Sequence, residues 1–160
     1  MALEIERKFL LLDARWRSEI SRSEAMRQAY LGGSKCSMRV RIGASGAYLN
    51  LKAKRLGVQR LEYEYPIPTE QAIELIEHFA EGAVIIKTRH FVPSADGLVF
   101  EIDEFAGDNS GLIVAELELP SADFAFEKPP WLGAEVTEQS RYYNSNLVAR
   151  PFITWGNAWD

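Results

Sequence analysis

The stretch Leu3-Glu4-Ile5-Glu6-Arg7-Lys8-Phe9 places a charged residue at every second position, namely Glu4, Glu6 and Lys8. Successive side chains of a β-strand point to opposite faces, so these three side chains would share one face of a strand. The alternate positions are mostly apolar, as expected for a face that packs against other residues. We therefore predict that residues 3–12 form a β-strand with one charged face.

Seven further segments alternate with the same period of two. They cover residues 25–31, 37–44, 47–54, 59–67, 84–92, 98–105 and 113–119. The turns Ala44-Ser45-Gly46 and Ala95-Asp96-Gly97 predict hairpins, and therefore antiparallel pairing. Many short strands with few helices in 160 residues predict one mainly β domain over residues 1–160, folded as a barrel or a sandwich.

Helices are predicted to interrupt or follow the strands. In the clearest of them, apolar residues recur at helical spacing between Thr69, the predicted N-cap, and Gly82, where the pattern ends. Two further helices are predicted, one over residues 13–23 and one over residues 137–148 with Thr137 as N-cap. The tail, residues 151–160, shows no clear period and is left unassigned. The fold class is therefore an antiparallel β structure with a few flanking helices.

The composition limits the kind of protein. No run of 18 apolar residues is present, so we expect no membrane span. The single cysteine, Cys36, excludes an intrachain disulfide. The formal net charge of −5 argues against a nucleic-acid-binding protein, whose binding surface would be basic. Since the first residues also lack the apolar segment of a signal peptide, we expect a cytoplasmic protein that binds neither nucleic acid nor membrane.

Charged residues occupy one face of almost every predicted strand, usually in doublets of a single sign. The basic residues are Lys8, Arg39, Arg41, Lys52, Arg60, Lys87 and Arg89, with Arg141 from the last predicted helix. The acidic residues are Glu4, Glu6, Glu62, Glu64, Glu101, Asp103, Glu116 and Glu118. In a sheet with one wet face these charges would simply point to solvent. However, two like charges on the same solvent-exposed face do not stabilise the strand. A site that binds both a cation and an anion, by contrast, requires paired acidic residues and paired basic residues.

A water-filled barrel could hold both sets of charges, because neighbours of opposite sign pair and water screens the rest. A dry cavity could not, since each unpaired buried ion costs several kcal/mol. The basic residues would suit a polyphosphate, and the carboxylates would supply the oxygen ligands that Mg²⁺ or Mn²⁺ prefers. The pattern favours a site where a divalent cation and a polyphosphate meet.

The charged pairs form a series of motifs that resembles the CYTH superfamily, also called the triphosphate tunnel metalloenzymes. In chain order the motifs are Glu4-Ile5-Glu6-Arg7-Lys8, Arg39-Val40-Arg41, Lys52, Arg60-Leu61-Glu62-Tyr63-Glu64, Lys87-Thr88-Arg89, Glu101-Ile102-Asp103, Glu116-Leu117-Glu118 and Arg141-Tyr142. The resemblance covers residues 1–146. It implies an eight-stranded antiparallel β-barrel, open as a tunnel and often dimeric, so a homodimer is one expected state. It also implies a metal-dependent enzyme that acts on a triphosphate-bearing small molecule.

The resemblance also implies roles for individual residues. The predicted metal ligands are Glu4, Glu6, Glu64, Asp103, Glu116 and Glu118, for one or two Mg²⁺ or Mn²⁺ ions. The predicted substrate-binding residues are Lys8, Arg39, Arg41, Lys52, Arg60, Lys87, Arg89 and Arg141. Of these sets, Lys87, Glu4 and Glu6 are predicted to take part in catalysis, where a metal would position a water against a terminal phosphorus.

The preferred reaction is hydrolysis of inorganic tripolyphosphate to pyrophosphate and phosphate, which the short bacterial members of the superfamily tend to catalyse. Thiamine triphosphate, a nucleoside triphosphate, or ATP cyclised to cyclic AMP are alternative substrates. The chain departs from the cyclase pattern, because its His-Phe pair follows Lys87 and no Leu-Gly pair precedes Glu116. A non-catalytic polyphosphate-binding module is an alternative of a different class, but such a module has no use for the acidic doublets.

Overall fold

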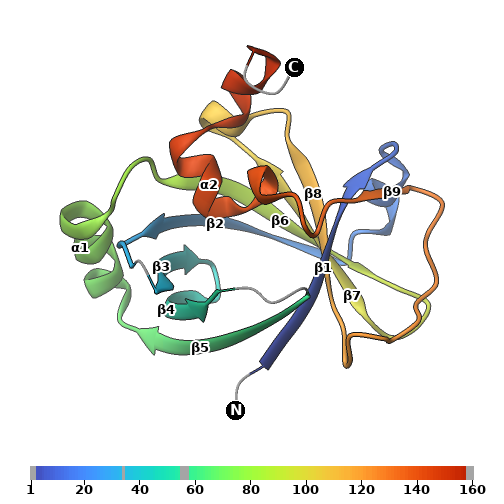
Figure 1. Ribbon diagram of the computed structural model, residues 1–160, viewed down its shortest axis with the longest axis horizontal. Helices are drawn as coiled ribbons and strands as arrows, with labels where there is room; N and C mark the ends of the chain where they lie inside the picture. The colour runs from blue at the N-terminus through green and yellow to red at the C-terminus, as the bar shows by residue number, and fades with distance from the viewer. Residues whose placement is uncertain (1–2, 34, 55–57, 158–160) are drawn as a thin grey trace.

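The computed structural model describes residues 3–33, 35–54 and 58–157. Within them, eight strands close into an antiparallel barrel (Figure 1). The strands are β1 Leu3–Leu11, β2 Arg22–Tyr30, β3 Cys36–Gly43, β4 Gly46–Ala53, β5 Gln59–Ile67, β6 Ile85–Pro93, β7 Val99–Phe105 and β8 Ile113–Glu118. Their order is β5-β4-β3-β2-β6-β7-β8-β1, and pairing of β1 with β5 closes the ring. The predicted barrel is confirmed, and the sandwich is excluded.

Both predicted hairpins are confirmed. Strands β3 and β4 pair up to Gly43 and Gly46, and strands β6 and β7 pair up to Pro93 and Val99. The second turn contains Gly97 at φ 78°, a backbone conformation that glycine adopts without steric cost. A further strand, β9 Leu132–Glu135, pairs with Phe9 and Leu11 of β1 on the edge opposite to β8 and was not predicted. It is too short to show a clear period of two.

The helix α1, Thr69–Phe79, is confirmed, but its N-cap is not Thr69. Thr69 is the first helical residue, Pro68 occupies the N-cap position, and no side-chain cap forms. The predicted helix over residues 13–23 is wrong in extent. Only a 3-10 helix forms there, η1 Arg15–Glu19, because Arg22 onward pairs with β6 and the hydrogen bonds of the sheet outweigh the local preference.

The C-terminal segment differs most from the prediction. It contains two short helices, η3 Ser140–Tyr142 and α2 Asn144–Ala149, instead of one helix over residues 137–148. Thr137 is not an N-cap, because its hydroxyl accepts a hydrogen bond from the Lys8 backbone N–H (3.0 Å) and donates to Glu135. A 3-10 helix, η4 Phe152–Asn157, occupies the tail, whose residues 158–160 lie outside the described residues. Another, η2 Gly107–Asn109, joins β7 to β8.

None of the helices in the described ranges is long and apolar enough to cross a membrane.

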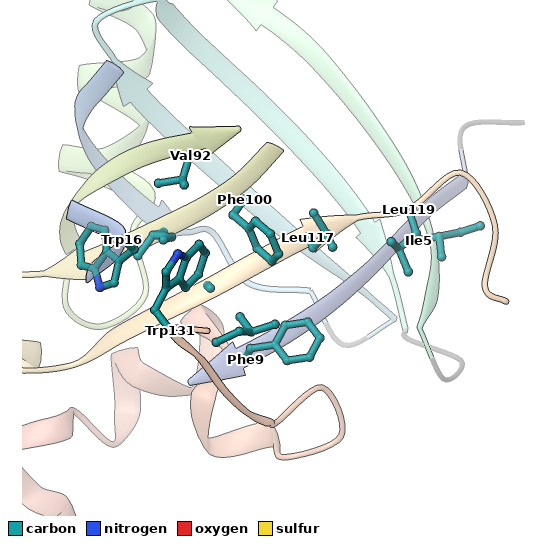
Figure 2. Close-up of a cluster of buried hydrophobic side chains, with 11 residues drawn as sticks. Ile5, Phe9, Trp16, Val92, Phe100, Leu117, Leu119 and Trp131 are labelled. Atoms are coloured by element: carbon teal, nitrogen blue, oxygen red, sulfur yellow. The ribbon is translucent and has the colours of Figure 1, made fainter. Parts of the chain in front are cut away.

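The largest apolar cluster lies on the outer face of the barrel, against β1, β6, β7 and β8. It consists of Ile5, Phe9, Trp16, Val92, Phe100, Ile102, Ala115, Leu117, Leu119, Trp131 and Leu132. Figure 2 shows how Trp16 and Trp131 cover the side chains that project from these strands. Because the strand residues of this cluster alternate with the charged ones, the charged residues point into the barrel. The barrel therefore has its apolar core outside and its ions inside.

A second apolar cluster lies at one end of the barrel interior. On the inner face, Leu10, Ile85, Phe105 and Val114 stand two residues beyond Lys8, Lys87, Asp103 and Glu116, respectively. These apolar side chains pack with Tyr142, Leu147 and Trp155 from η3, α2 and η4. Figure 1 shows α2 lying across this end of the barrel. The C-terminal helices thus cover the charged interior on that side.

Candidate active site

A cavity of about 390 Å³ occupies the barrel interior, and residues from all eight barrel strands line it. Fourteen of the charged residues singled out in the sequence take part: Glu4, Glu6, Lys8, Arg39, Arg41, Lys52, Arg60, Glu62, Glu64, Lys87, Arg89, Glu101, Glu116 and Glu118. The start of α2 also reaches the cavity, through Tyr143, Asn144 and Ser145. The alternation along each strand therefore brings residues from distant parts of the chain to one site.

Part of the cavity wall carries closely spaced cations. Burial, together with repulsion from Arg39 and Arg89, lowers the pKa of Arg41 to about 10. Arg39 is buried, and its guanidinium lies 3.8 Å from Glu62 in a loose ion pair. Its Nε atom has no hydrogen-bond acceptor within the described residues. A buried donor without an acceptor, in a group of mutually repelling cations, fits a site whose ligand is an anion.

Lys52 belongs to a mixed group of charges nearer the start of β1. Its Nζ atom lies 3.3 Å from Glu4 and 3.6 Å from Glu62. Burial and the neighbouring Arg39 lower the pKa of Lys52. Burial alone would raise the pKa of Glu4, but the Lys52 ammonium lowers it, so this carboxylate stays ionised.

Asp103 lies behind the cavity wall instead of lining it. Its carboxylate is 1% exposed and accepts hydrogen bonds from Lys87 Nζ (2.7 Å), Arg89 Nε (2.8 Å) and Arg89 Nη2 (2.9 Å). Although burial opposes ionisation, Arg89 and Lys87 lower the pKa of Asp103 to about 2. Both carboxylate oxygens are thus engaged by cations, which places Asp103 apart from the carboxylates that face the cavity.

Lys87 is fully enclosed, and burial is the main reason why its pKa falls to about 7. The nearby Arg89 and Arg41 also disfavour its charge, whereas Asp103 favours it. Its Nζ donates a further hydrogen bond to Asn144 Oδ1 at 3.1 Å. With a pKa near neutrality, the neutral amine of Lys87 would gain a proton readily when an anion approaches.

The carboxylates of β1 and β8 form the acidic part of the site. Glu6 faces Glu118 directly in the antiparallel pair, and Lys8 faces Glu116. Burial, then repulsion by Glu116 and Glu4, raises the pKa of Glu6 well above its ordinary value. Burial, then repulsion by Glu4 and Glu101, raises the pKa of Glu118. Crowding of carboxylates to this degree is relieved by a bound cation, so these oxygen donors fit a hard divalent metal.

The acidic residues do not by themselves complete a coordination sphere. Among the described residues, no three Asp, Glu, His or Cys side chains converge closely enough to hold a metal ion. Mg²⁺ is commonly held by one or two carboxylates and completed by substrate phosphates and water. The donor set therefore fits a metal that binds together with its anionic substrate.

Other predicted residues are placed as follows. Arg141 does not line the cavity, because its guanidinium lies over the rings of Tyr142 and Trp155, at 5.0 and 5.2 Å from the ring centroids. Arg60 lines the cavity and also donates from Nε to the Ala53 carbonyl at 2.8 Å. Glu64 lines the cavity as predicted and accepts a hydrogen bond from Asn50 at 2.7 Å.

Sequence reasoning missed several polar residues of the site. Gln28 and Asn50 are fully buried and hydrogen-bond to charged residues that line the cavity. Both occupy inward positions, two residues from Tyr30 and Lys52, so strict counting along β2 and β4 would have found them. Asn144 has no such signal, because only the packing of α2 brings it to the barrel.

The structure therefore defines a closed antiparallel barrel whose interior is lined by paired cations and carboxylates. The profile of the CYTH domain matches residues 2–152, and the chain belongs to this family. The resemblance seen in the motifs is confirmed.

Named relatives resemble the chain over nearly its full length. The inorganic triphosphatase of Acetivibrio thermocellus is 42% identical over 153 residues, which cover 95% of this chain and 97% of that protein. The inorganic triphosphatase of Nitrosomonas europaea is 39% identical over 149 residues, covering 91% and 96%. The crystal structure of the inorganic triphosphatase NE1496 matches with a TM-score of 0.66 and 37% identity, over 92% of this chain and 95% of that one.

Proposed function

We propose that this protein is a divalent-metal-dependent phosphohydrolase that cleaves inorganic tripolyphosphate to pyrophosphate and phosphate. The observation that carries the proposal is the cavity itself, in which buried, crowded cations meet crowded carboxylates inside one closed barrel. The choice of substrate is supported by the two relatives that are named inorganic triphosphatases and match nearly the whole chain.

The cations would hold the phosphate chain and neutralise charge as the bond breaks. Phosphoryl transfer depends mainly on positioning and electrostatic stabilisation, which a rigid barrel supplies. We assign substrate binding to Lys8, Arg39, Arg41, Lys52, Arg60, Lys87 and Arg89. Lys87 is only 2% exposed, and an anionic substrate would stabilise its charged form, so we assign it the role of a cation close to the reacting phosphate. We leave Arg141 out of this set, because it lies over Tyr142 and Trp155.

We assign metal binding, for Mg²⁺ or Mn²⁺, to Glu4, Glu6, Glu116 and Glu118, with Glu64 as a further candidate. When bound at these carboxylates, such an ion would supply Lewis-acid chemistry to the phosphate group and to an attacking water. Because the oxygens of Asp103 already accept hydrogen bonds from Lys87 and Arg89, we propose that it positions these cations.

Phosphate release from inorganic tripolyphosphate, measured with Mg²⁺ or Mn²⁺ and again with a chelator, tests the reaction. We expect turnover to require metal, and Glu4→Gln and Glu116→Gln to lower kcat about 100-fold or more. Glu77→Gln, on the exposed surface of α1, is the matched control and should retain full activity. Unchanged turnover in both interior variants would refute the metal assignment.

A substrate panel separates the remaining alternatives. Thiamine triphosphate and ATP would be assayed for phosphate release in parallel, and ATP also for cyclic AMP. Inorganic tripolyphosphate should give the highest kcat/KM. Tight binding of tripolyphosphate in a calorimeter, without phosphate release at any metal concentration, would instead support the non-catalytic binding module.

Assembly and location are further proposals. Tyr63 and Tyr65 are 42% and 49% exposed on the outer face of β5, where a second copy of the chain could cover them. We propose a homodimer, which sedimentation at several protein concentrations would test. We also propose a cytoplasmic enzyme whose substrate is a small molecule and not a nucleic acid or membrane, consistent with its net charge of −5.

A further inference from the structure

Four side chains form a continuous hydrogen-bonded chain across the barrel interior. Arg41 Nε donates to Gln28 Oε1 at 3.1 Å, and Gln28 Nε2 donates to Asn144 Oδ1 at 2.9 Å. Lys87 Nζ donates to the same Asn144 oxygen at 3.1 Å. Two neutral amides therefore connect two cations that belong to different strands.

The position of Gln28 explains why β2 can link these strands. Strand β2 lies between β3 and β6, and Gln28 is the direct partner of Arg41 in the first pair. In the second pair Lys87 is the partner of Met26, two residues from Gln28 on the same face. Asn144, the first residue of α2, completes the connection between Gln28 and Lys87, because its side-chain oxygen accepts a hydrogen bond from each of them. The link is therefore made partly by the sheet and partly by the C-terminal helix.

The donors and acceptors of these four side chains allow only one arrangement of the hydrogen bonds between them. Arg and Lys side chains donate and cannot accept, so each needs an oxygen opposite it. Gln28 accepts from Arg41 with its oxygen and donates onward with its nitrogen, and the Asn144 oxygen accepts from both sides. Gln28 is 0% exposed, so water does not compete for its amide. The three hydrogen bonds of this link restrict the side-chain torsions of both cations.

We propose that Gln28 and Asn144 are positioning residues that hold Arg41 and Lys87 at the separation needed to bind neighbouring phosphates of the substrate. This inference rests on the proposed function and deepens it. It gives α2 a role in the reaction, because the helix supplies the amide oxygen that orients the Lys87 ammonium. Without the link, both cations would have to be ordered by the substrate at each turnover.

Asn144→Ala removes the central acceptor, and Asn146→Ala is the matched control. Asn146 lies on the same helix and also makes one amide hydrogen bond, to the Ser140 carbonyl at 2.6 Å, but this side chain is exposed. We expect Asn144→Ala to lower kcat/KM for inorganic tripolyphosphate about tenfold, equivalent to about 1.4 kcal/mol, mainly through kcat. Asn146→Ala should keep wild-type kinetics. Both melting temperatures would be measured alongside.

A double-mutant cycle separates a link from a merely structural contact. Arg41→Lys keeps a positive charge but lacks the guanidinium Nε that donates to Gln28. If the link exists, the combined effect of Arg41→Lys and Asn144→Ala is smaller than the product of the single effects by about threefold or more. Arg41→Lys combined with Asn146→Ala should be additive. Should Asn144→Ala fail to fold, Gln28→Met, which removes the amide at similar size and adds no charge, breaks the same link and enters the cycle in its place.

The same cycle, measured as the Kd of metal-free inorganic tripolyphosphate by calorimetry, does not depend on turnover. A wild-type protein that binds tripolyphosphate but releases no phosphate would refute the proposed function, while the coupling in Kd would still decide on the link. Additive effects of Asn144 and Arg41 substitutions, in kinetics and in Kd, would overturn the inference. Equal losses of melting temperature for Asn144→Ala and Asn146→Ala with unchanged kinetics would overturn it as well.

Discussion

Replacing Asp103 by Asn tests whether the buried ions of the barrel depend on one another. The substitution preserves the shape of the side chain but removes the negative charge between Lys87 and Arg89. The carboxylate is 1% exposed and its oxygens accept three hydrogen bonds from these cations. Asn can satisfy only part of this geometry, because one oxygen becomes an amide that donates. Two buried cations would therefore lose their common partner.

The expected loss of unfolding free energy follows from the surroundings. Breaking a buried ion pair by removing one partner costs about 3–5 kcal/mol. The lower end applies here, because Arg89 keeps its ion pairs with Glu101 and Glu116, and because the pKa of Lys87, about 7, allows it to lose its proton. For a chain of this size, about 3 kcal/mol corresponds to a fall in Tm of about 6–12 °C.

Thermal unfolding followed by circular dichroism, at neutral pH and without ligand, measures this loss. The matched control is Asp13→Asn, because Asp13 also pairs with an arginine, Arg15, through several hydrogen bonds, but on the exposed surface. The control should unfold at the wild-type temperature, since solvent screens an exposed pair. Equal melting temperatures for Asp103→Asn and the wild type would refute the view that the charges of the barrel are mutually dependent.

The direction in which pH changes the stability difference between the wild type and Asp103→Asn follows from the pKa of Asp103. The pKa of Asp103 is lowered from 3.8 to about 2 in the folded protein, so its charged form stabilises the fold at any pH above about 3.8. This contribution is lost as the pH falls from about 4 towards 2. The difference in stability between wild type and Asp103→Asn should therefore narrow below about pH 4.

Three further predictions concern the core, a turn and the cavity wall. Phe9→Ala should lower the unfolding free energy by about 3–5 kcal/mol in urea denaturation, because Phe9 is fully buried in the outer cluster, whereas Phe79→Ala, at a site 62% exposed, should change it little. Burial opposes ionisation of Glu24, but hydrogen bonds from Ser45 in the β3–β4 turn lower the pKa of this carboxyl. Glu24→Gln should therefore lower the unfolding free energy at pH 7, and by progressively less as the pH falls below about 4.5. A difference in unfolding free energy between the two proteins that does not change with pH would contradict this assignment. Arg41→Gln should raise KM for inorganic tripolyphosphate about tenfold, and Arg7→Gln, on the outer face beside β9, should leave KM unchanged in the phosphate-release assay.

Strand alternation made most of the barrel predictable. All eight barrel strands were located from the period of two; the start of β2 lies three residues before the predicted one, at Arg22 instead of residue 25, and the other bounds differ by at most one residue. The same alternation identified the inward residues, because neighbouring side chains on a strand must face opposite sides. Helix bounds were less predictable, as the segment around Thr137 shows. The Thr137 hydroxyl accepts a hydrogen bond from the Lys8 backbone N–H and does not cap a helix.

The sequence predicted most of the charged residues of the candidate site but none of its neutral amide residues. The order of the motifs along the chain identified the family, and fourteen of the predicted charged residues line one cavity. Two charged residues were placed elsewhere by packing: Asp103 lies behind the wall, and Arg141 lies over aromatic rings. Gln28 and Asn144 carry no distinctive pattern, and their importance follows only from the atoms that they contact.

By itself, the sequence determined that the strands form and that each has a charged and an apolar face, and from the charged faces it predicted a site for a cation and a polyphosphate. These are local properties, because the direction of a side chain depends on its position along its own strand. Only the tertiary structure decided which end of the barrel the C-terminal helices cover, and which amide joins Arg41 to Lys87. Those features depend on strand register and on the packing of α2, which arise from contacts between residues more than a hundred positions apart.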